Sequence, residues 1–142
     1  MSAIVDLEKL SHRSKSRIKN LGEVFTPESY VEDMLAILAK NKKNFWADEE
    51  ISFFEPCAGH GNIVLSIYKR RLEGIYKKAI SRGAKEATYY SIANSISPLW
   101  AIDIDSKNIE NCRSRVLSAT LDFLKSKLET KSDFALFSKK KD

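Results

Sequence analysis

The sequence predicts an α/β protein built as a truncated, doubly wound (Rossmann-like) sheet with helices on both faces. Two short apolar segments, 51–54 and 99–102, are each followed directly by an acid. A turn with two glycines, Gly59 and Gly61, separates the first segment from a stretch with helical periodicity. Strand, glycine turn and helix in this order are typical of open α/β sheets, which bind ligands beyond the carboxyl ends of their strands.

Residues 1–21 predict an amino-terminal helix and a basic connector, ahead of a main domain that we expect to span residues 22–142. Ile4, Leu7 and Leu10 recur at three-residue intervals, and a stretch rich in lysine and arginine follows them. The simpler interpretation of that stretch is a solvated connector. The alternative is an arm that contacts phosphates.

A helix is expected to begin at Thr26-Pro27 and to continue to about residue 40. Threonine can cap free N–H groups, and proline is tolerated at the first helical position. Apolar residues spaced at i, i+3, i+4 and i+7 then predict one buried stripe, made by Val31, Met34, Leu35 and Leu38.

The segment between the two strands is longer than one helix requires, so a helical insertion is expected over about residues 70–98. We expect a long helix over residues 62–81, a break at Gly83 and a second helix over residues 84–96. Their polar surface carries cations and two tyrosines: Lys69, Arg70, Arg71, Lys77, Lys78, Tyr89 and Tyr90. A solvated face is the simpler interpretation; a surface that tracks single-stranded nucleic acid and a subunit interface are the alternatives.

The second strand, expected over residues 99–103, leads into another helix over about residues 107–128. The spacing of its apolar residues predicts an inward side made by Ile109, Cys112, Val116, Leu117, Leu121 and Leu124. A third strand is expected at residues 133–137. The three strands, the first of them at 51–55, are expected to pair side by side.

The acids at the strand ends indicate which ligand the glycine turn would accept. Asp103 ends the second strand, where an acid accepts hydrogen bonds from ribose hydroxyls in related sheets. Glu55 stands beside the turn, where it would repel a pyrophosphate and attract a ligand with an amino group. This arrangement of charge favours S-adenosylmethionine over a dinucleotide.

Three motifs follow one another along the chain: Gly22-Glu23-Val24-Phe25-Thr26-Pro27, Glu55-Pro56-Cys57-Ala58-Gly59-His60-Gly61 and Ala101-Ile102-Asp103-Ile104-Asp105. In this order they resemble the cofactor motifs of the S-adenosylmethionine-dependent DNA methyltransferases that modify the exocyclic amino group of adenine. The resemblance covers roughly residues 17–117. It differs in one detail, because the family more often has Ala-Cys where this sequence has Cys57-Ala58.

The resemblance implies a cofactor site made by Phe25, Thr26, Pro27, Glu55, Cys57, Gly59, Gly61, Asp103 and Ile104. In the family the F-T-P turn contacts the methionine end of the cofactor, so Thr26 is expected to hold its carboxylate. The glycines are expected to let the backbone approach the ligand. Asp103 is expected to accept hydrogen bonds from the ribose hydroxyls.

The family's acceptor motif, an Asp/Asn-Pro-Pro-aromatic tetrapeptide, does not occur in this sequence. The three prolines are Pro27, Pro56 and Pro98, and none neighbours another. We therefore expect no catalytic residue here. The chain is interpreted as one subunit of a split enzyme, whose partner supplies the acceptor motif and target recognition, or as a catalytically incomplete relative. The alternative is a non-enzymatic accessory module that binds DNA or a protein and keeps a vestigial cofactor pocket.

The composition bounds the partners and the location. Lys and Arg outnumber Asp and Glu by 24 to 19, a net charge of +5 that permits DNA as a partner. No apolar run approaches the ~20 residues of a membrane span and no signal peptide begins the sequence, so a cytoplasmic protein with no membrane partner is expected. The two cysteines and two histidines lie at no spacing typical of a disulfide framework or a metal site, so no metal is expected.

Overall fold

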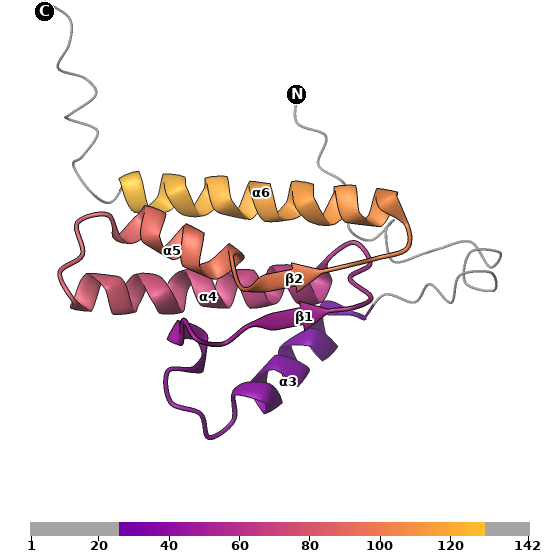
Figure 1. The fold of residues 1–142 in the computed structure, drawn as a ribbon, viewed down its shortest axis with the longest axis horizontal. Helices are drawn as coiled ribbons and strands as arrows, with labels where there is room; N and C mark the ends of the chain where they lie inside the picture. The colour runs from indigo at the N-terminus through magenta and orange to yellow at the C-terminus, as the bar shows by residue number, and fades with distance from the viewer. Residues whose placement is uncertain (1–25, 130–142) are drawn as a thin grey trace, which may run out of the picture.

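The computed structural model describes residues 26–129 (Figure 1). In this range the chain forms α3 (Glu28–Ala39), the 3-10 turn η1 (Phe45–Ala47), β1 (Phe53–Glu55), α4 (Asn62–Ser81), α5 (Ala87–Ile96), β2 (Leu99–Ala101) and α6 (Ser106–Glu129). The predicted α/β class is therefore confirmed. The protein is mostly helical, with a small parallel sheet of two strands.

The two strands pair in parallel, with Phe53 opposite Leu99 and Glu55 opposite Ala101. Each strand has three residues, fewer than the sequence predicts. Backbone bonds extend the ladder by one step at each end, from Phe53 N to Pro98 O at 2.8 Å and from Ile102 N to Glu55 O at 3.0 Å. The predicted strand at 133–137, the predicted amino-terminal helix and Phe25 lie outside the described residues.

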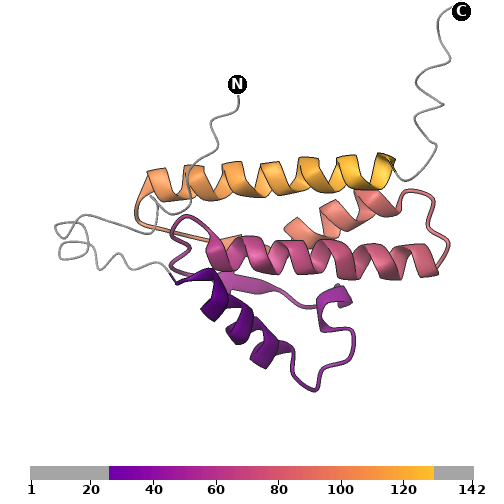
Figure 2. The same ribbon diagram turned by 180° about the vertical axis from the view of Figure 1, so that it is seen from behind.

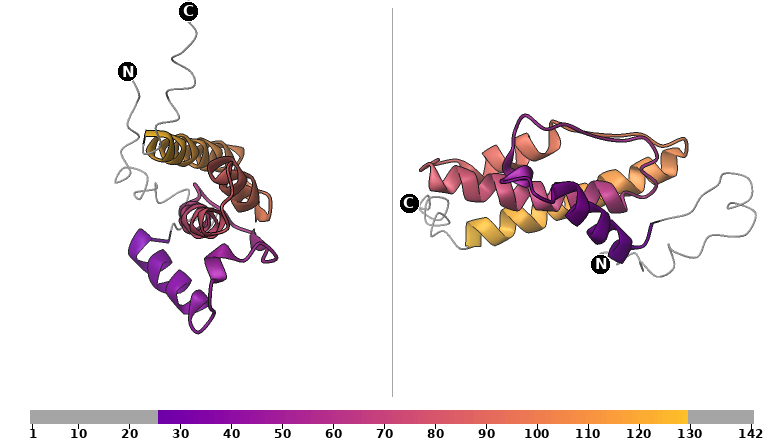
Figure 3. Two further views of the ribbon diagram at one scale, coloured as in Figure 1. Left: turned by 90° about the vertical axis from the view of Figure 1, so that its left-hand side faces the viewer. Right: turned by 90° about the horizontal axis from the view of Figure 1, so that it is seen from below.

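Helices cover one face of this sheet. Phe53 of β1 packs with Val31, Leu35 and Ile67 of α3 and α4, and Leu99 of β2 joins the same core. In Figure 1 the strands lie in front of α4, and in Figure 2, seen from behind, α4 lies in front of the strands. The end-on view in Figure 3 places α4 between α3 and α6. One helical layer therefore packs on the inner face of the sheet.

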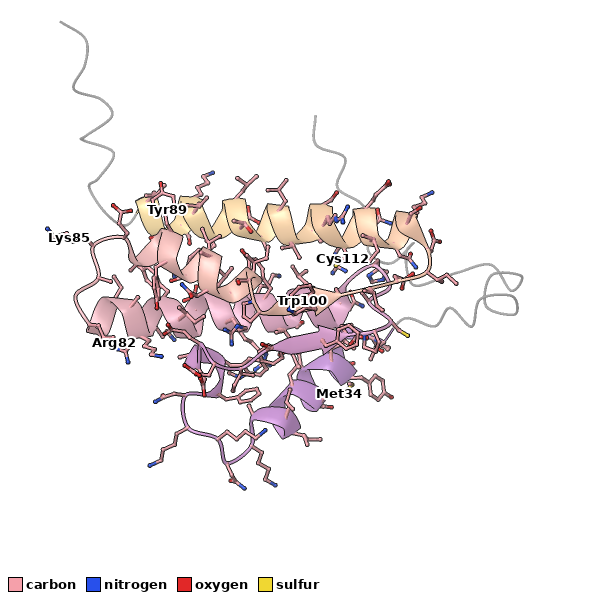
Figure 4. All side chains as sticks on the ribbon, in the orientation of Figure 1. Met34, Arg82, Lys85, Tyr89, Trp100 and Cys112 are labelled. Atoms are coloured by element: carbon pink, nitrogen blue, oxygen red, sulfur yellow. The ribbon has the colours of Figure 1, made fainter. Side chains whose placement is uncertain are left out.

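The opposite face of the sheet, called the outer face, is bare among the described residues. It carries Phe54 and Trp100, which are partners in the strand register and are each 65% exposed, together with Ile102, which is 55% exposed. Figure 4 labels Trp100 over β2. Successive side chains of a strand point to opposite faces, so this follows directly from the burial of Phe53 and Leu99 on the inner face. Within residues 26–129, the helices expected on the second face are not found.

The apolar stripes that the sequence predicts for α3 and α6 include residues that the structure leaves exposed. In α3, Val31 and Leu35 are buried, whereas Met34 and Leu38 are exposed. In α6, Cys112 is buried as expected, but Leu117 and Leu121 are exposed and Phe123 lies in the core instead. The strands have only three residues each, so the inner face of the sheet packs against only part of each helix.

Arg71 was expected on the polar side of α4, but it is fully buried. Its guanidinium donates to the backbone carbonyls of Asp48 at 2.9 Å and Asn94 at 3.0 Å, and it lies over the ring of Phe53. Burial lowers the pKa of this group. Arg71 therefore joins α4 to the chain before β1 and to α5.

No helix in the described range is both long and apolar enough to cross a membrane.

Candidate cofactor site

A glycine turn joins β1 to α4 at the carboxyl ends of both strands. Gly59 and Gly61 adopt positive φ angles of 53° and 92°, a conformation that glycine takes without steric cost. Ala58 N donates to Ile102 O at 2.9 Å, which fastens the turn to the end of β2. The predicted junction of strand, turn and helix is therefore present, and β2 holds it in place.

Asp103 lies directly beside this turn. Its Oδ2 accepts a hydrogen bond from Gly59 N at 2.7 Å, and its Oδ1 accepts from Asp105 N at 2.9 Å and from Asn108 Nδ2 at 3.2 Å. An ionised carboxylate offers about four acceptor positions, so room for a further donor remains. The sequence motif suggested only a ligand-binding role; the structure adds that Asp103 fixes the conformation of the turn.

Glu55 and the start of α4 place opposite charges at the turn. Glu55 is half-buried, and its Oε1 accepts from Cys57 N at 3.0 Å, while Cys57 itself is exposed. No side chain caps α4, and its first helical hydrogen bond runs from Leu65 N to Gly61 O, so the N–H groups of the first turn point outward. A carboxylate beside a helix amino end suits a ligand that carries both an amino group and a carboxylate.

Asn62 links the turn to the segment that carries Thr26. Its Nδ2 donates to Thr26 O at 2.9 Å, while its Oδ1 accepts from Arg115 Nη1 at 2.8 Å. Arg115 Nη1 also lies 2.9 Å from His60 O and 2.8 Å from His60 Nδ1. These polar contacts bring α6, the glycine turn and the residue before α3 together.

Sequence reasoning missed Asn62 and Arg115, and it did not predict the burial of His60. This histidine is 4% exposed and packs against Arg115. Burial lowers the pKa of the Arg115 guanidinium. The one available signal was an asparagine directly after Gly61; Arg115 belongs to a different helix, and its contact with the turn follows only from tertiary packing.

Gly61 is required by packing, while its predicted role of letting the backbone approach the ligand stays a prediction. A Cβ at this position would lie 2.5 Å from Sγ and 3.0 Å from Cβ of Cys112 on α6. Cys112 is buried, and burial raises the pKa of its thiol. The missing side chain of Gly61 therefore allows α6 to approach the turn closely.

The remaining candidate residues surround the turn at its solvent side. Thr26 is half-buried, Pro27 is exposed and Ile104 is 92% exposed next to Asp103. Of the nine predicted site residues, the eight within the described range lie in the turn, at the two strand ends or in the segment that Asn62 holds against the turn. Motifs that are distant in the sequence thus lie close together at the carboxyl ends of the strands.

Comparisons with known protein families, curated proteins and solved structures find no match for this chain. The functional assignment therefore depends on the motifs and on the geometry described above.

Proposed function

We propose that this chain binds S-adenosylmethionine and forms the cofactor-binding half of an adenine-specific DNA methyltransferase, on a truncated Rossmann-like sheet. The observation that carries the proposal is the convergence of three motifs. Asn62 bonds to Thr26 across 36 positions of sequence, and Gly59 bonds to Asp103 across 44. Parallel pairing of β1 and β2 brings Gly59 and Asp103 together, and a shared ligand would account for the residue types that meet there and for the link to Thr26.

The charges at the turn suit the groups of this cofactor. Glu55 would accept from the ammonium of the methionine part, and Thr26 together with the free N–H groups at the start of α4 would hold its carboxylate. Asp103 retains acceptor capacity for a ribose hydroxyl, and the exposed side chain of Ile104 offers an apolar surface for the adenine ring. A dinucleotide fits less well, because its pyrophosphate would lie against the Glu55 carboxylate.

Two features support the interpretation as one part of a split enzyme. Methylation of an adenine needs acceptors for the target amino group and an aromatic platform for the flipped base, which this sequence does not supply in the expected tetrapeptide. The outer face exposes Phe54 and Trp100, whereas parallel sheets are normally covered on both faces. The partner polypeptide that carries the acceptor motif would pack on this face and so reach the adjoining strand ends.

Isothermal titration of the full chain with S-adenosylmethionine tests the proposal. Binding is expected, NAD should not bind, and Glu55→Gln should weaken binding by about tenfold to 100-fold, since a hydrogen bond to a charged group contributes about 1.5–3 kcal/mol. Glu86→Gln is the matched control, because Glu86 is exposed at the start of α5 and the same charge is removed. No binding by the wild-type chain would overturn the proposal and favour the accessory module.

A methyl-transfer assay with labelled cofactor separates the split enzyme from an inactive relative. The chain alone should not methylate unmethylated DNA of mixed sequence, because the acceptor groups are missing. Transfer that depends on an added partner subunit would select the split enzyme. Robust transfer by the chain alone would contradict the interpretation of an incomplete site.

A further inference from the structure

A groove with a volume of about 890 Å³ lies between η1, the loop before it and the last turns of α4. It is called here the α4–η1 groove. Five cationic side chains line it, against a single acidic one, Asp48: Lys42, Lys43, Lys77, Lys78 and Arg82. The groove is therefore strongly basic. Its lining includes only some of the cations that the sequence predicts on the polar side of α4.

Most of these cations are available for a ligand. Lys78 is not, because it pairs with Glu49 at 2.8 Å and donates to Ala47 O at 3.0 Å. Lys42, Lys43, Lys77 and Arg82 are exposed and have no ion pair within residues 26–129. Such a group of unpaired like charges is held together only by the fold, and a polyanion would relieve their mutual repulsion.

Backbone geometry builds the concave shape. Gly74 lines the groove, and a Cβ there would lie 3.0 Å from the backbone of Trp46, so the missing side chain lets η1 settle on α4. Asn44, which precedes η1, adopts a left-handed φ of 56° that turns the chain. As a result Lys42 and Lys43 come from the loop side of the groove, Lys77 comes from α4, and Arg82 directly follows α4.

The aromatic residues of the groove decide between single-stranded and double-stranded nucleic acid. Phe45 is buried, and the Trp46 ring stacks on Phe53 with centroids 5.9 Å apart and an interplanar angle of 11°. Neither ring is free to stack on a base, which single-strand binding sites require. Lysine and arginine without a stacking platform suit the backbone of a duplex, which carries one negative charge per ~1.7 Å.

We propose that the α4–η1 groove binds the phosphate backbone of double-stranded DNA. The groove lies away from the candidate cofactor site: Figure 4 labels Arg82 at one end of α4 and Cys112, the neighbour of Gly61, near the other. Because α4 has 20 residues, its two ends are about 30 Å apart. The contact holds DNA without reading its sequence, and it does not depend on the proposed cofactor function.

Fluorescence anisotropy with a labelled 20-base-pair duplex, at 50–200 mM salt, tests this inference on the full chain. Four phosphate contacts in the groove should contribute about −3.6 to the slope of log K against log salt, which corresponds to about a 100-fold loss of affinity over this range. The double variant Lys43→Gln, Lys77→Gln should make the slope shallower by about 1.8. The readout is the difference in slope between the variant and the wild type, because the basic stretch near the amino terminus adds to the total slope of both proteins.

The matched control is the double variant Lys107→Gln, Arg113→Gln, which removes the same charge from exposed positions on α6. It should leave the slope within about 0.5 of the wild-type value, since it removes no phosphate contact. Equal slopes for the two double variants would overturn the inference, and so would tighter binding of a single strand of the same length. Both variants should bind S-adenosylmethionine like wild type, so a failure of this inference is separable from a failure of the proposed function.

Discussion

The two faces of the sheet are made by alternate residues of the same two strands, yet they differ completely in burial. Phe53 on the inner face is 8% exposed and packs with α3 and α4. Its neighbour Phe54 and the adjacent Trp100 on the outer face are each 65% exposed. Both faces offer large aromatic side chains, so composition does not explain the difference; only the inner face has helices to pack against within residues 26–129.

The inner face contributes to the stability of the described fold, whereas the outer face leaves apolar side chains uncovered. The inner face, with its helices, contains the described core and fixes the glycine turn. The outer face keeps apolar surface that a covering layer would bury at about 25 cal/mol per Å². A further layer on the outer face would therefore gain apolar contacts that the described residues leave unmade.

The largest expected effect compares the two neighbouring phenylalanines. Phe53→Ala should lower the free energy of unfolding by about 3–5 kcal/mol, because it leaves a cavity in the core. Phe54→Ala, the matched control on the same strand, should change it by less than about 0.5 kcal/mol. Urea unfolding measures both. A similar loss for Phe54→Ala would mean that the outer face is already covered in the isolated chain.

The next effect concerns the contact between the turn and α6. Gly61→Ala should cost about 2–4 kcal/mol, because the positive φ disfavours alanine and the new Cβ collides with Cys112. Gly83→Ala is the control, since it also has a positive φ of 74° but meets nothing within 4 Å, and it should cost only about 1–2 kcal/mol.

A double-mutant cycle isolates the collision itself. Adding Cys112→Ala to Gly61→Ala removes the Sγ atom that the new Cβ would meet, so the pair should be more stable than the sum of the single effects by about 1 kcal/mol or more. Thermal and urea unfolding of the four proteins give this coupling. Strict additivity would show that Gly61 is needed for its conformation alone.

The smallest expected effect comes from Glu49, which precedes β1. The Lys78 ammonium, and after it the Tyr90 hydroxyl, hold the pKa of this carboxyl below its ordinary value of 4.5. A lowered pKa stabilises the fold above the unfolded-state value and is lost as the pH falls through the folded-state value. Glu49→Gln should therefore cost up to about 1 kcal/mol at pH 7, and the difference from wild type should shrink as the pH falls below the ordinary value of 4.5 and vanish once the pH is below the folded-state value. A difference that stays constant with pH would exclude the charge as its source.

Local patterns predicted the helices and the junction of strand, glycine turn and helix better than they predicted side-chain burial. The predicted bounds of α4 agree with the structure because helical periodicity runs between two glycines, Gly61 and Gly83. The proximity of Asp103 to the glycine turn also followed from the rule that parallel strands end at the same edge.

The errors have a common physical origin. Arg71 is buried because it meets backbone carbonyls 23 positions away in either direction, and Arg115 meets His60 across 55 positions. Periodicity describes the residue's own helix and contains no information about such partners. The predicted helices on the second face of the sheet stay a prediction, because residues 26–129 do not contain them.

The most direct test of the central claim, that one ligand site forms at the carboxyl ends of the strands, is the amide ¹H–¹⁵N NMR spectrum during titration with S-adenosylmethionine. Amides of residues 57–62 and 103–105 should shift and saturate together, because they surround one ligand. Amides of Phe54 on the outer face and of Lys43 and Lys77 in the α4–η1 groove should stay in place. Shifts confined to the groove, or no shift at millimolar cofactor, would contradict the account.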